Sequence, residues 1–285
     1  SIGTSMPELF ISVTSALNGY SDMAIGNVIG SNLSNLLLIL GSCALIKNLK
    51  FKKETRYFES PFTLLVTLLV FALANNNLSF QPNTITRLEG IILLLVCVAF
   101  IIYSIIMAKK GEEFDDLTDG ISKDLAIVDI KTQSLKYIIK SIFNIILGIV
   151  CLKYGGDFVV DNASKIAITL GMTEKMVSVT IVAIATSLPE LITSIVATTK
   201  NKVDIAIGNI IGSCILNLIL IIGVSAIIKP VKYSVSYNMD FLILIVATLL
   251  LCLFPIIGKK NEMSKAQGAI FFFSYIMYMC ITILA

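Results

Sequence analysis

The sequence contains TSMPEL at residues 4–9 and TSLPEL at residues 186–191. A second pair of segments follows them, AIGNVIGS at residues 24–31 and AIGNIIGS at residues 206–213. Both pairs are separated by 182 positions, and 19 of 38 positions are identical when residues 4–41 are aligned without gaps to residues 186–223. The chain therefore contains an internal duplication, and any proposed fold has to account for it.

The composition predicts an integral membrane protein in a lipid bilayer. Of the 285 residues, 56% are hydrophobic and 14% are charged, and the mean hydropathy is +0.90. A soluble domain has about 25% charged residues, so a water-soluble globule is excluded. The net charge of +3 is too small to indicate a nucleic-acid partner. The chain has no histidine, which excludes imidazole metal sites and Ser-His or Cys-His nucleophile pairs. We expect neither enzyme activity nor a bound cofactor.

Apolar stretches of about 20 residues can cross a bilayer as helices. Six stretches meet this criterion without an interrupting charge: residues 23–46, 60–86, 90–108, 205–228, 241–258 and 266–285. Two more, residues 1–18 and 176–199, are interrupted by Glu8 and Glu190 respectively. A ninth, residues 136–154, is apolar only between Lys140 and Lys153. The sequence therefore predicts nine membrane spans.

The distribution of basic residues predicts the orientation of these spans. When the loops are assigned alternately to two sides, 16 of the 22 Lys and Arg residues fall on one side. The positive-inside rule places these loops, with the acidic segment 109–133, in the cytoplasm of a multi-pass cell-membrane protein, and Ala285 outside. The span with Glu8 then runs outward and the span with Glu190 runs inward. The two copies are therefore inverted relative to each other.

This topology predicts three parts: a first inverted-repeat half at residues 1–108, a solvated acidic linker at 109–133 and a second half at 134–285. The fold class is an all-α integral membrane protein with two inverted-topology repeats of about five transmembrane helices each. The second half has a span before its motif that the first half lacks. We therefore expect a first helix and the start of a second to lie within about 40 residues upstream of Ser1.

Each repeat places a glutamate in mid-membrane, directly after a proline. Pro7 and Pro189 have no N–H, so the carbonyls near Gly3 and Ala185 are free to bind a ligand. Hydroxyl groups precede each glutamate, and the following helix carries polar residues at i, i+4 and i+8, which form one stripe. The hydroxyls belong to Thr4, Ser5, Thr186 and Ser187, and the stripes consist of Asn27, Ser31 and Asn35, and of Asn209, Ser213 and Asn217.

The acidic residues indicate what this site binds. Among the 19, only Glu8 and Glu190 lie deep inside predicted spans. A charge at the bilayer centre costs about 2.5–3.5 kcal/mol on insertion scales, and no Lys or Arg lies at matching depth. Two carboxylates with carbonyl and hydroxyl oxygens are typical of a Ca²⁺ site. Asp22 and Asp204 are predicted helix N-caps rather than ligands. The amides of Asn27 and Asn209 either contribute to the site or only join neighbouring helices.

The duplicated motifs resemble the two α-repeats of the sodium/calcium exchanger family, in the cation/calcium antiporter superfamily, as found in prokaryotic-type members. The resemblance implies ten helices in two inverted halves, and makes Glu8 and Glu190 the carboxylates shared by Ca²⁺ and Na⁺. The other implied ligands are hydroxyl, amide or backbone oxygens: those of Thr4, Ser5, Thr186 and Ser187, with Ser31, Ser213 and Asn35 nearby. Well-studied members carry an aspartate at the position of Asn217, so this site has two formal negative charges rather than three.

The predicted function is secondary active antiport of Ca²⁺ for Na⁺ by alternating access, carried out by a monomer. Exchange of H⁺ for Ca²⁺, or K⁺-dependent exchange, on the same scaffold is the alternative, because a buried glutamate can also carry a proton. A cation channel fits less well, since pores usually require symmetric rings of ligands.

Overall fold

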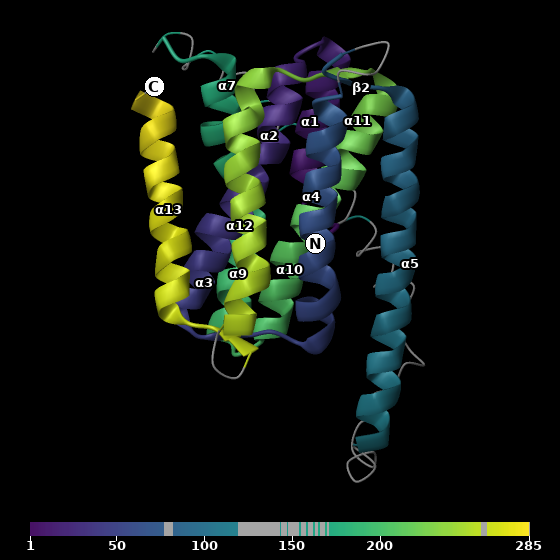
Figure 1. Ribbon diagram of the computed structural model, residues 1–285, viewed down its shortest axis with the longest axis vertical. Coiled ribbons are helices and arrows are strands. Elements are labelled where there is room, and N and C mark those ends of the chain that lie inside the picture. The colour runs from purple at the N-terminus through teal and green to yellow at the C-terminus, as the bar shows by residue number, and fades with distance from the viewer. Residues whose placement is uncertain are drawn as a thin grey trace.

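The computed structural model describes residues 1–76, 82–118, 171–257 and 261–284, together with isolated positions between 143 and 169. Within these ranges the helices run nearly along one long axis and form a single bundle (Figure 1). The span predicted at residues 136–154 falls almost entirely outside the described residues.

The first half consists of four helical segments. It begins with α1 (Met6–Asn18), followed by a long helix made of α2 (Ser21–Leu33), the π-helical stretch η1 (Ser34–Leu40) and α3 (Gly41–Ile46). The π-helical stretch η2 (Thr55–Glu59) then leads into α4 (Ser60–Ala74), and α5 (Arg87–Thr118) ends this part.

The second half has the same order of elements. A helix made of α7 (Glu174–Val177), the π-helical stretch η4 (Ser178–Val182) and α8 (Ala183–Thr186) precedes α9 (Leu188–Thr199). The next long helix combines α10 (Val203–Leu216), the π-helical stretch η5 (Asn217–Ile221) and α11 (Ile222–Ile228). The 3₁₀ turn η6 (Val235–Tyr237), α12 (Asn238–Ile257) and α13 (Lys265–Leu284) complete it.

Most of the predicted spans are confirmed by length and composition. Among the described residues, six helices could cross a membrane, and the pair Lys175–Thr186 and Leu188–Thr199, bent by 45°, would be a seventh. The span predicted at residues 1–18 is shorter, because α1 has 13 residues and begins next to Pro7. The span predicted to end at residue 86 ends at Ala74 instead, where Asn75 and Asn76, poor helix formers, follow.

Four two-residue strands connect the two halves. β1 (Leu49–Lys50) pairs antiparallel with β4 (Glu262–Met263), and β2 (Thr84–Ile85) pairs antiparallel with β3 (Val231–Lys232). The two pairs lie at opposite ends of the bundle (Figure 1), and β1 and β3 occupy equivalent positions in the repeats. A two-residue antiparallel strand pair thus joins the halves at each end of the bundle. The predicted inverted-repeat, all-α fold is confirmed.

The turns between the motif helices correct one prediction. Gly19 (φ 86°) and Asn201 (φ 62°), at equivalent positions, both adopt the left-handed conformation, so the next helices start early, with Tyr20 and Lys202 as N-caps. Asp22 and Asp204 are therefore not N-caps; they lie in the first turn, where a negative charge is favourable to the helix dipole.

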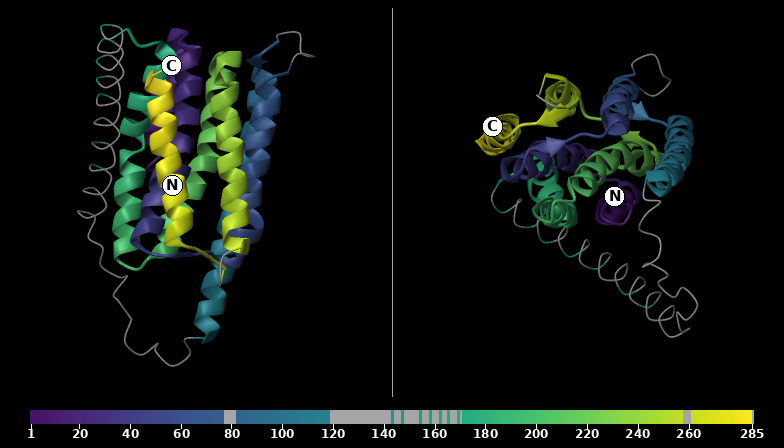
Figure 2. Two further views of the ribbon diagram at one scale, coloured as in Figure 1. Left: turned by 60° about the vertical axis from the view of Figure 1, so that its left-hand side comes forward. Right: turned by 90° about the horizontal axis from the view of Figure 1, so that it is seen from below.

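Burial separates the central helices from the peripheral ones. In the spans that contain α2 and α10, 78% and 83% of the apolar window is buried, against 17% for α5 and 22% for α13. Figure 2 shows α5 and α13 at the edges of the bundle, and large apolar side chains such as Leu88 and Phe273 are exposed there. In a membrane protein such a surface faces lipid, which leaves the two motif-bearing helices enclosed by protein.

Candidate ion-binding site

The site is built on the N-terminal ends of two short helices that point in opposite directions. Glu8 lies in the first turn of α1 and Glu190 in the first turn of α9, each beside a proline that starts its helix. Both glutamates are 0% exposed. A carboxylate in the first turn is favoured by the helix dipole, which partly offsets the cost of burying its charge. Figure 1 shows the chain start before α1 near mid-height of the bundle.

Serine hydroxyls join the two repeats crosswise. Ser5 and Ser187 are the N-cap residues of α1 and α9, yet neither side chain caps its own helix. Instead the Ser5 hydroxyl donates to Glu190 Oε1 over 3.1 Å, and the Ser187 hydroxyl donates to Glu8 Oε1 over 3.4 Å. Each carboxylate is therefore held by the opposite repeat. Ser213 adds a further hydroxyl to Glu190 Oε1, over 3.3 Å.

Each carboxylate keeps one oxygen without a hydrogen-bond partner. Oε2 of Glu8 and Oε2 of Glu190 are buried and accept no hydrogen bond, and neither carboxylate pairs with a Lys or Arg in the described part of the chain. The two groups also repel each other electrostatically. Buried polar atoms are rarely left without a partner, so two such oxygens in one repulsive pair are well suited to a cation.

Threonine and backbone oxygens lie beside the serines. The Thr4 hydroxyl donates to the Ser1 carbonyl over 2.9 Å, and the Thr186 hydroxyl donates to the Ala183 carbonyl over 3.1 Å. These two carbonyls occupy equivalent positions in the repeats. The Ser31 hydroxyl lies 3.2 Å from Thr186 Oγ1. Among the described residues, no group of three or more Asp, Glu, His or Cys side chains converges, so any ion held here relies on uncharged oxygens as well.

A separate amide cluster lies where the two long central helices meet. Asn217 Nδ2 donates to Asn32 Oδ1 over 3.3 Å. Asn35 is 0% exposed, and both its amide nitrogen and its amide oxygen lack hydrogen-bond partners. Asn35 lies in η1 and Asn217 begins η5, the π-helical stretches that interrupt these helices. Such stretches often occur at functional sites.

The structure therefore brings most of the predicted residues together. The residues joined by contacts across the repeats are Thr4, Ser5, Glu8, Ser31, Thr186, Ser187 and Glu190, and Ser213 joins them through Glu190 of its own repeat. Asn217 contacts Asn32, and Asn35 lies buried in η1 without a hydrogen-bond partner. Gly3 is exposed and Ala185 is partly exposed, and their carbonyls remain predicted ligands.

Three polar residues of this region were not predicted. Ser12 and Ser194 accept hydrogen bonds from the amides of Asn27 and Asn209, and their identity in the aligned repeats is a signal that could have indicated them. Asn32 has no such signal, because Cys214 occupies the equivalent position.

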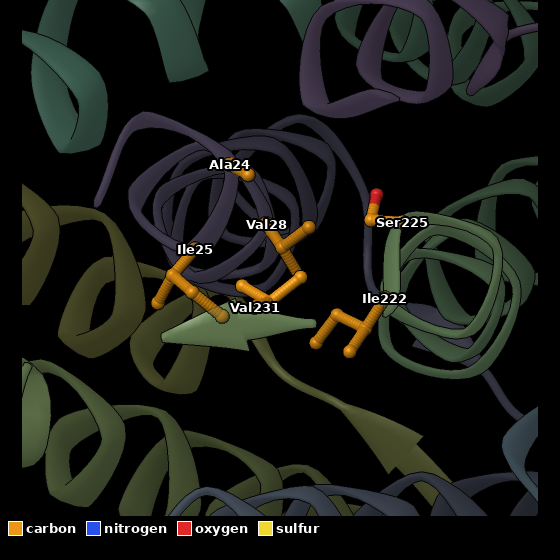
Figure 3. Close-up of a pocket in the computed structure, with 6 residues that line it drawn as sticks. All are labelled: Ala24, Ile25, Val28, Ile222, Ser225 and Val231. Atoms are coloured by element: carbon orange, nitrogen blue, oxygen red, sulfur yellow. The ribbon is translucent and has the colours of Figure 1, made fainter. Parts of the chain in front are cut away.

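The pocket drawn in Figure 3 is a different feature. It lies between α2, α11 and β3 and is lined mainly by apolar side chains such as Ile25, Val28 and Ile222. It is too narrow for a water molecule. Ser225 contributes its only hydroxyl group, so this pocket does not offer an ion a set of oxygen ligands.

Inverted repeats that meet at a buried site on broken helices define the class of inverted-repeat membrane transporters. The chain belongs to the sodium/calcium exchanger protein family, whose sequence model matches residues 1–106 and 140–284. The resemblance noted from the motifs is therefore confirmed.

Two relatives and one solved structure illustrate the similarity. The chain is 30% identical over 254 residues to the inner membrane protein YrbG of Escherichia coli, covering 89% of this chain and 75% of that protein. It is 26% identical over 303 residues to the sodium/calcium exchanger MaX1 of Methanosarcina acetivorans, covering 98% and 85%. A structure of the sodium-calcium exchanger NCX_Mj, soaked with 10 mM Na⁺ and zero Ca²⁺, superposes with a TM-score of 0.69 at 28% identity, covering 98% and 83%.

Proposed function

We propose that this protein exchanges Ca²⁺ for Na⁺ by alternating access, at a site centred on Glu8 and Glu190. The observation that carries the proposal is the pair of buried carboxylates, each with an unpartnered oxygen and neither paired with a basic side chain in the described chain. Family membership and the similarity to proteins named as sodium/calcium exchangers support the same reading.

The ligand set of the proposed site consists of oxygen atoms only. The carboxylates come from Glu8 and Glu190, and the hydroxyls of Thr4, Ser5, Thr186, Ser187, Ser31 and Ser213 surround them. Oxygen ligands suit Ca²⁺, which takes 6–8 of them, and Na⁺, which prefers the same hard donors. Asn35 and Asn217 would extend the site with amide oxygens, and the carbonyls of Gly3 and Ala185, which the prolines leave without an N–H donor, would extend it with backbone oxygens.

The charge of the site suggests the stoichiometry. Two carboxylates balance either one Ca²⁺ or two Na⁺, and the amide of Asn217 adds no further charge. We therefore propose electroneutral exchange of two Na⁺ for one Ca²⁺. Protons could replace Na⁺ at the same carboxylates, which is why H⁺/Ca²⁺ exchange is the second candidate.

We also propose that the end of the bundle with the basic loops faces the cytoplasm of a cell membrane. At this end, Lys47 Nζ donates to Asn201 Oδ1 over 2.6 Å, and Lys52 lies 3.3 Å from Asp204, so the basic loops of both halves meet. The positive-inside rule favours the cytoplasm for such an end. The C-terminal end of α13 would then face outside, and since both repeats belong to one chain, a monomer can complete the site.

The deciding experiment is ⁴⁵Ca²⁺ uptake into liposomes that contain the purified protein. The uptake rate would be compared in otherwise identical vesicles with an imposed Na⁺ gradient, a pH gradient, a K⁺ gradient or no gradient. Uptake driven by the Na⁺ gradient alone supports the proposal, and uptake driven only by the pH gradient supports the second candidate. Clamping the membrane potential with K⁺ and valinomycin should leave the rate unchanged; a rate that follows the potential would refute the two-to-one stoichiometry.

A further inference from the structure

Two asparagines link the candidate ligands to residues outside the site. Asn27 Nδ2 donates to Ser12 Oγ over 3.0 Å, and the Thr186 hydroxyl lies 3.3 Å from Asn27 Oδ1. At the equivalent positions of the other repeat, Asn209 Nδ2 donates to Ser194 Oγ over 3.2 Å, and the Thr4 hydroxyl lies 3.0 Å from Asn209 Oδ1. Each chain of contacts thus starts with a serine and an asparagine of one repeat and ends on a threonine of the other.

The orientation of the first amide is fixed by its partners. Asn27 Nδ2 also donates to the backbone carbonyl of Glu8 over 3.3 Å. A carbonyl can only accept a hydrogen bond, so the nitrogen must face Glu8 and Ser12, and the oxygen must face Thr186. Asn27 and Ser12 are 0% and 1% exposed, which leaves no water to compete for these contacts.

The threonine has one proton and several acceptors. Asn27 Oδ1, the Ala183 carbonyl and Ser31 Oγ lie 3.3, 3.1 and 3.2 Å from Thr186 Oγ1. A hydroxyl that binds a cation must direct its proton away from the ion and its lone pair toward it. Ser31 Oγ can turn to a cation, and the Ala183 carbonyl already accepts the backbone N–H of Ser187 over 3.1 Å, whereas the amide oxygen is held in place by the contacts of its nitrogen. The amide oxygen is therefore the acceptor that can take this proton when an ion is present.

We propose that Asn27 and Asn209 are positioning residues, which accept the hydroxyl protons of Thr186 and Thr4 so that these oxygens present lone pairs to the transported ion. The backbone carbonyl of Glu8 fixes the orientation of Asn27, and Ser12 and Ser194 each accept a hydrogen bond from the amide nitrogen of their repeat. The inference rests on the proposed function, because it needs a cation at this site. It also has a specific consequence: each asparagine acts through the threonine of the opposite repeat and not through that of its own.

The test is a double-mutant cycle on equilibrium ⁴⁵Ca²⁺ binding to the purified full chain. Asn27→Ala and Thr186→Val are each expected to weaken binding about tenfold, the effect of losing one oriented buried hydrogen bond. Combined, they should weaken it no more than either alone, because the second change removes a contact that the first has already broken. Thr186→Ser keeps the hydroxyl, so it should bind Ca²⁺ almost as well as the parent protein. In the Thr186→Ser background, Asn27→Ala should again weaken binding about tenfold.

The pseudo-symmetry supplies the matched control. Asn209→Ala combined with Thr186→Val should weaken binding by the product of the single effects, about a hundredfold, because Asn209 contacts Thr4 instead. If Asn27→Ala does not fold, Ser12→Ala replaces it in the cycle, since Ser12 reaches Thr186 only through Asn27. Multiplicative effects in both pairs would refute the inference. Absence of Ca²⁺ binding by the unmodified chain would instead refute the proposed function.

Discussion

Replacing Glu190 by glutamine removes one of the two charges and little else. Gln has nearly the same shape, and its amide oxygen can still accept the hydroxyls of Ser5 and Ser213 that now reach Glu190 Oε1 over 3.1 and 3.3 Å. The carboxylate has no ion pair in the described chain, so no buried Lys or Arg loses its partner. The folded state should therefore persist, and the change isolates the contribution of charge to ion binding.

The two ions should respond differently to the loss of this charge. Unit charges 4 Å apart interact by about 4 kcal/mol at an effective dielectric constant of about 20. The loss is therefore about 4 kcal/mol for Na⁺ and about 8 kcal/mol for the doubly charged Ca²⁺. These are upper bounds, because an amide oxygen still coordinates. The difference, about 4 kcal/mol, corresponds to a decrease of up to about a thousandfold in the preference for Ca²⁺ over Na⁺.

The assay is competition between ⁴⁵Ca²⁺ and Na⁺ for the purified protein, with thermal unfolding measured in parallel. Glu89→Gln is the matched control. Glu89 is buried, at 8% exposed, but accepts its hydrogen bonds from Thr86 in its own helical turn, away from the motifs. We expect a lost Ca²⁺ preference for Glu190→Gln and unchanged competition for Glu89→Gln. Equal Ca²⁺ preference in Glu190→Gln and the parent protein would remove Glu190 from the site.

Three further predictions concern the surroundings of the site. Asn217→Asp should make ion exchange more dependent on pH between about 5 and 9, because three carboxylates in a dry site repel one another; superimposable profiles would show that residue 217 does not face the ions. Lys175→Met should lower the free energy of unfolding by about 1–3 kcal/mol, since it leaves the buried Asp240, 2.7 Å away, without its ion pair. Lys52→Met, which removes an exposed ion pair, should lower it by less than about 1 kcal/mol. Equal losses of the two variants in denaturant titrations would contradict this. Gly30→Ala should weaken Ca²⁺ binding, because its Cβ would lie 2.6 Å from Ala183 Cβ and 2.8 Å from the Val179 backbone on the bent helix. Gly90→Ala, whose Cβ would lie 2.9 Å from the Gly223 carbonyl between α5 and α11, should lower only the melting temperature. An unchanged Ca²⁺ affinity in Gly30→Ala would refute the argument.

Much of the fold followed from the sequence, because a membrane restricts it strongly. Every backbone polar group in lipid must be satisfied within its own element, so long apolar stretches become helices. The ungapped duplication around Glu8 and Glu190, with an odd number of crossings between the copies, then fixes the inversion. The same duplication indicated the serines and threonines beside the glutamates, because they are identical in both copies. The number of spans and their inversion are properties of the whole chain, so the composition and the repeat are enough to predict them.

Local geometry was less predictable. The π-helical stretches at Ser34–Leu40 and Asn217–Ile221 depend on how neighbouring helices pack, which the pattern of apolar residues does not encode. The positive φ of Asn201 moved the start of α10, and with it the role of Asp204. Proline indicated that carbonyls would be freed, but not that the helix bends by 45° between Thr186 and Leu188.

The crosswise contacts suggest how the proposed exchanger couples binding to movement. Ser5 belongs to α1 but donates to the carboxylate of α9, and Ser187 stands before α9 but donates to the carboxylate of α1. Any movement that parts the two helices must break these hydrogen bonds and leave buried carboxylate oxygens with fewer partners, which costs about 1–3 kcal/mol for each group. A bound cation attracts both carboxylates at once and offsets this cost, whereas an empty site has only their mutual repulsion. The two-residue strand pairs join the halves at both ends of the bundle. Ion occupancy would therefore determine when α1 and α9 come together, as exchange without leakage requires.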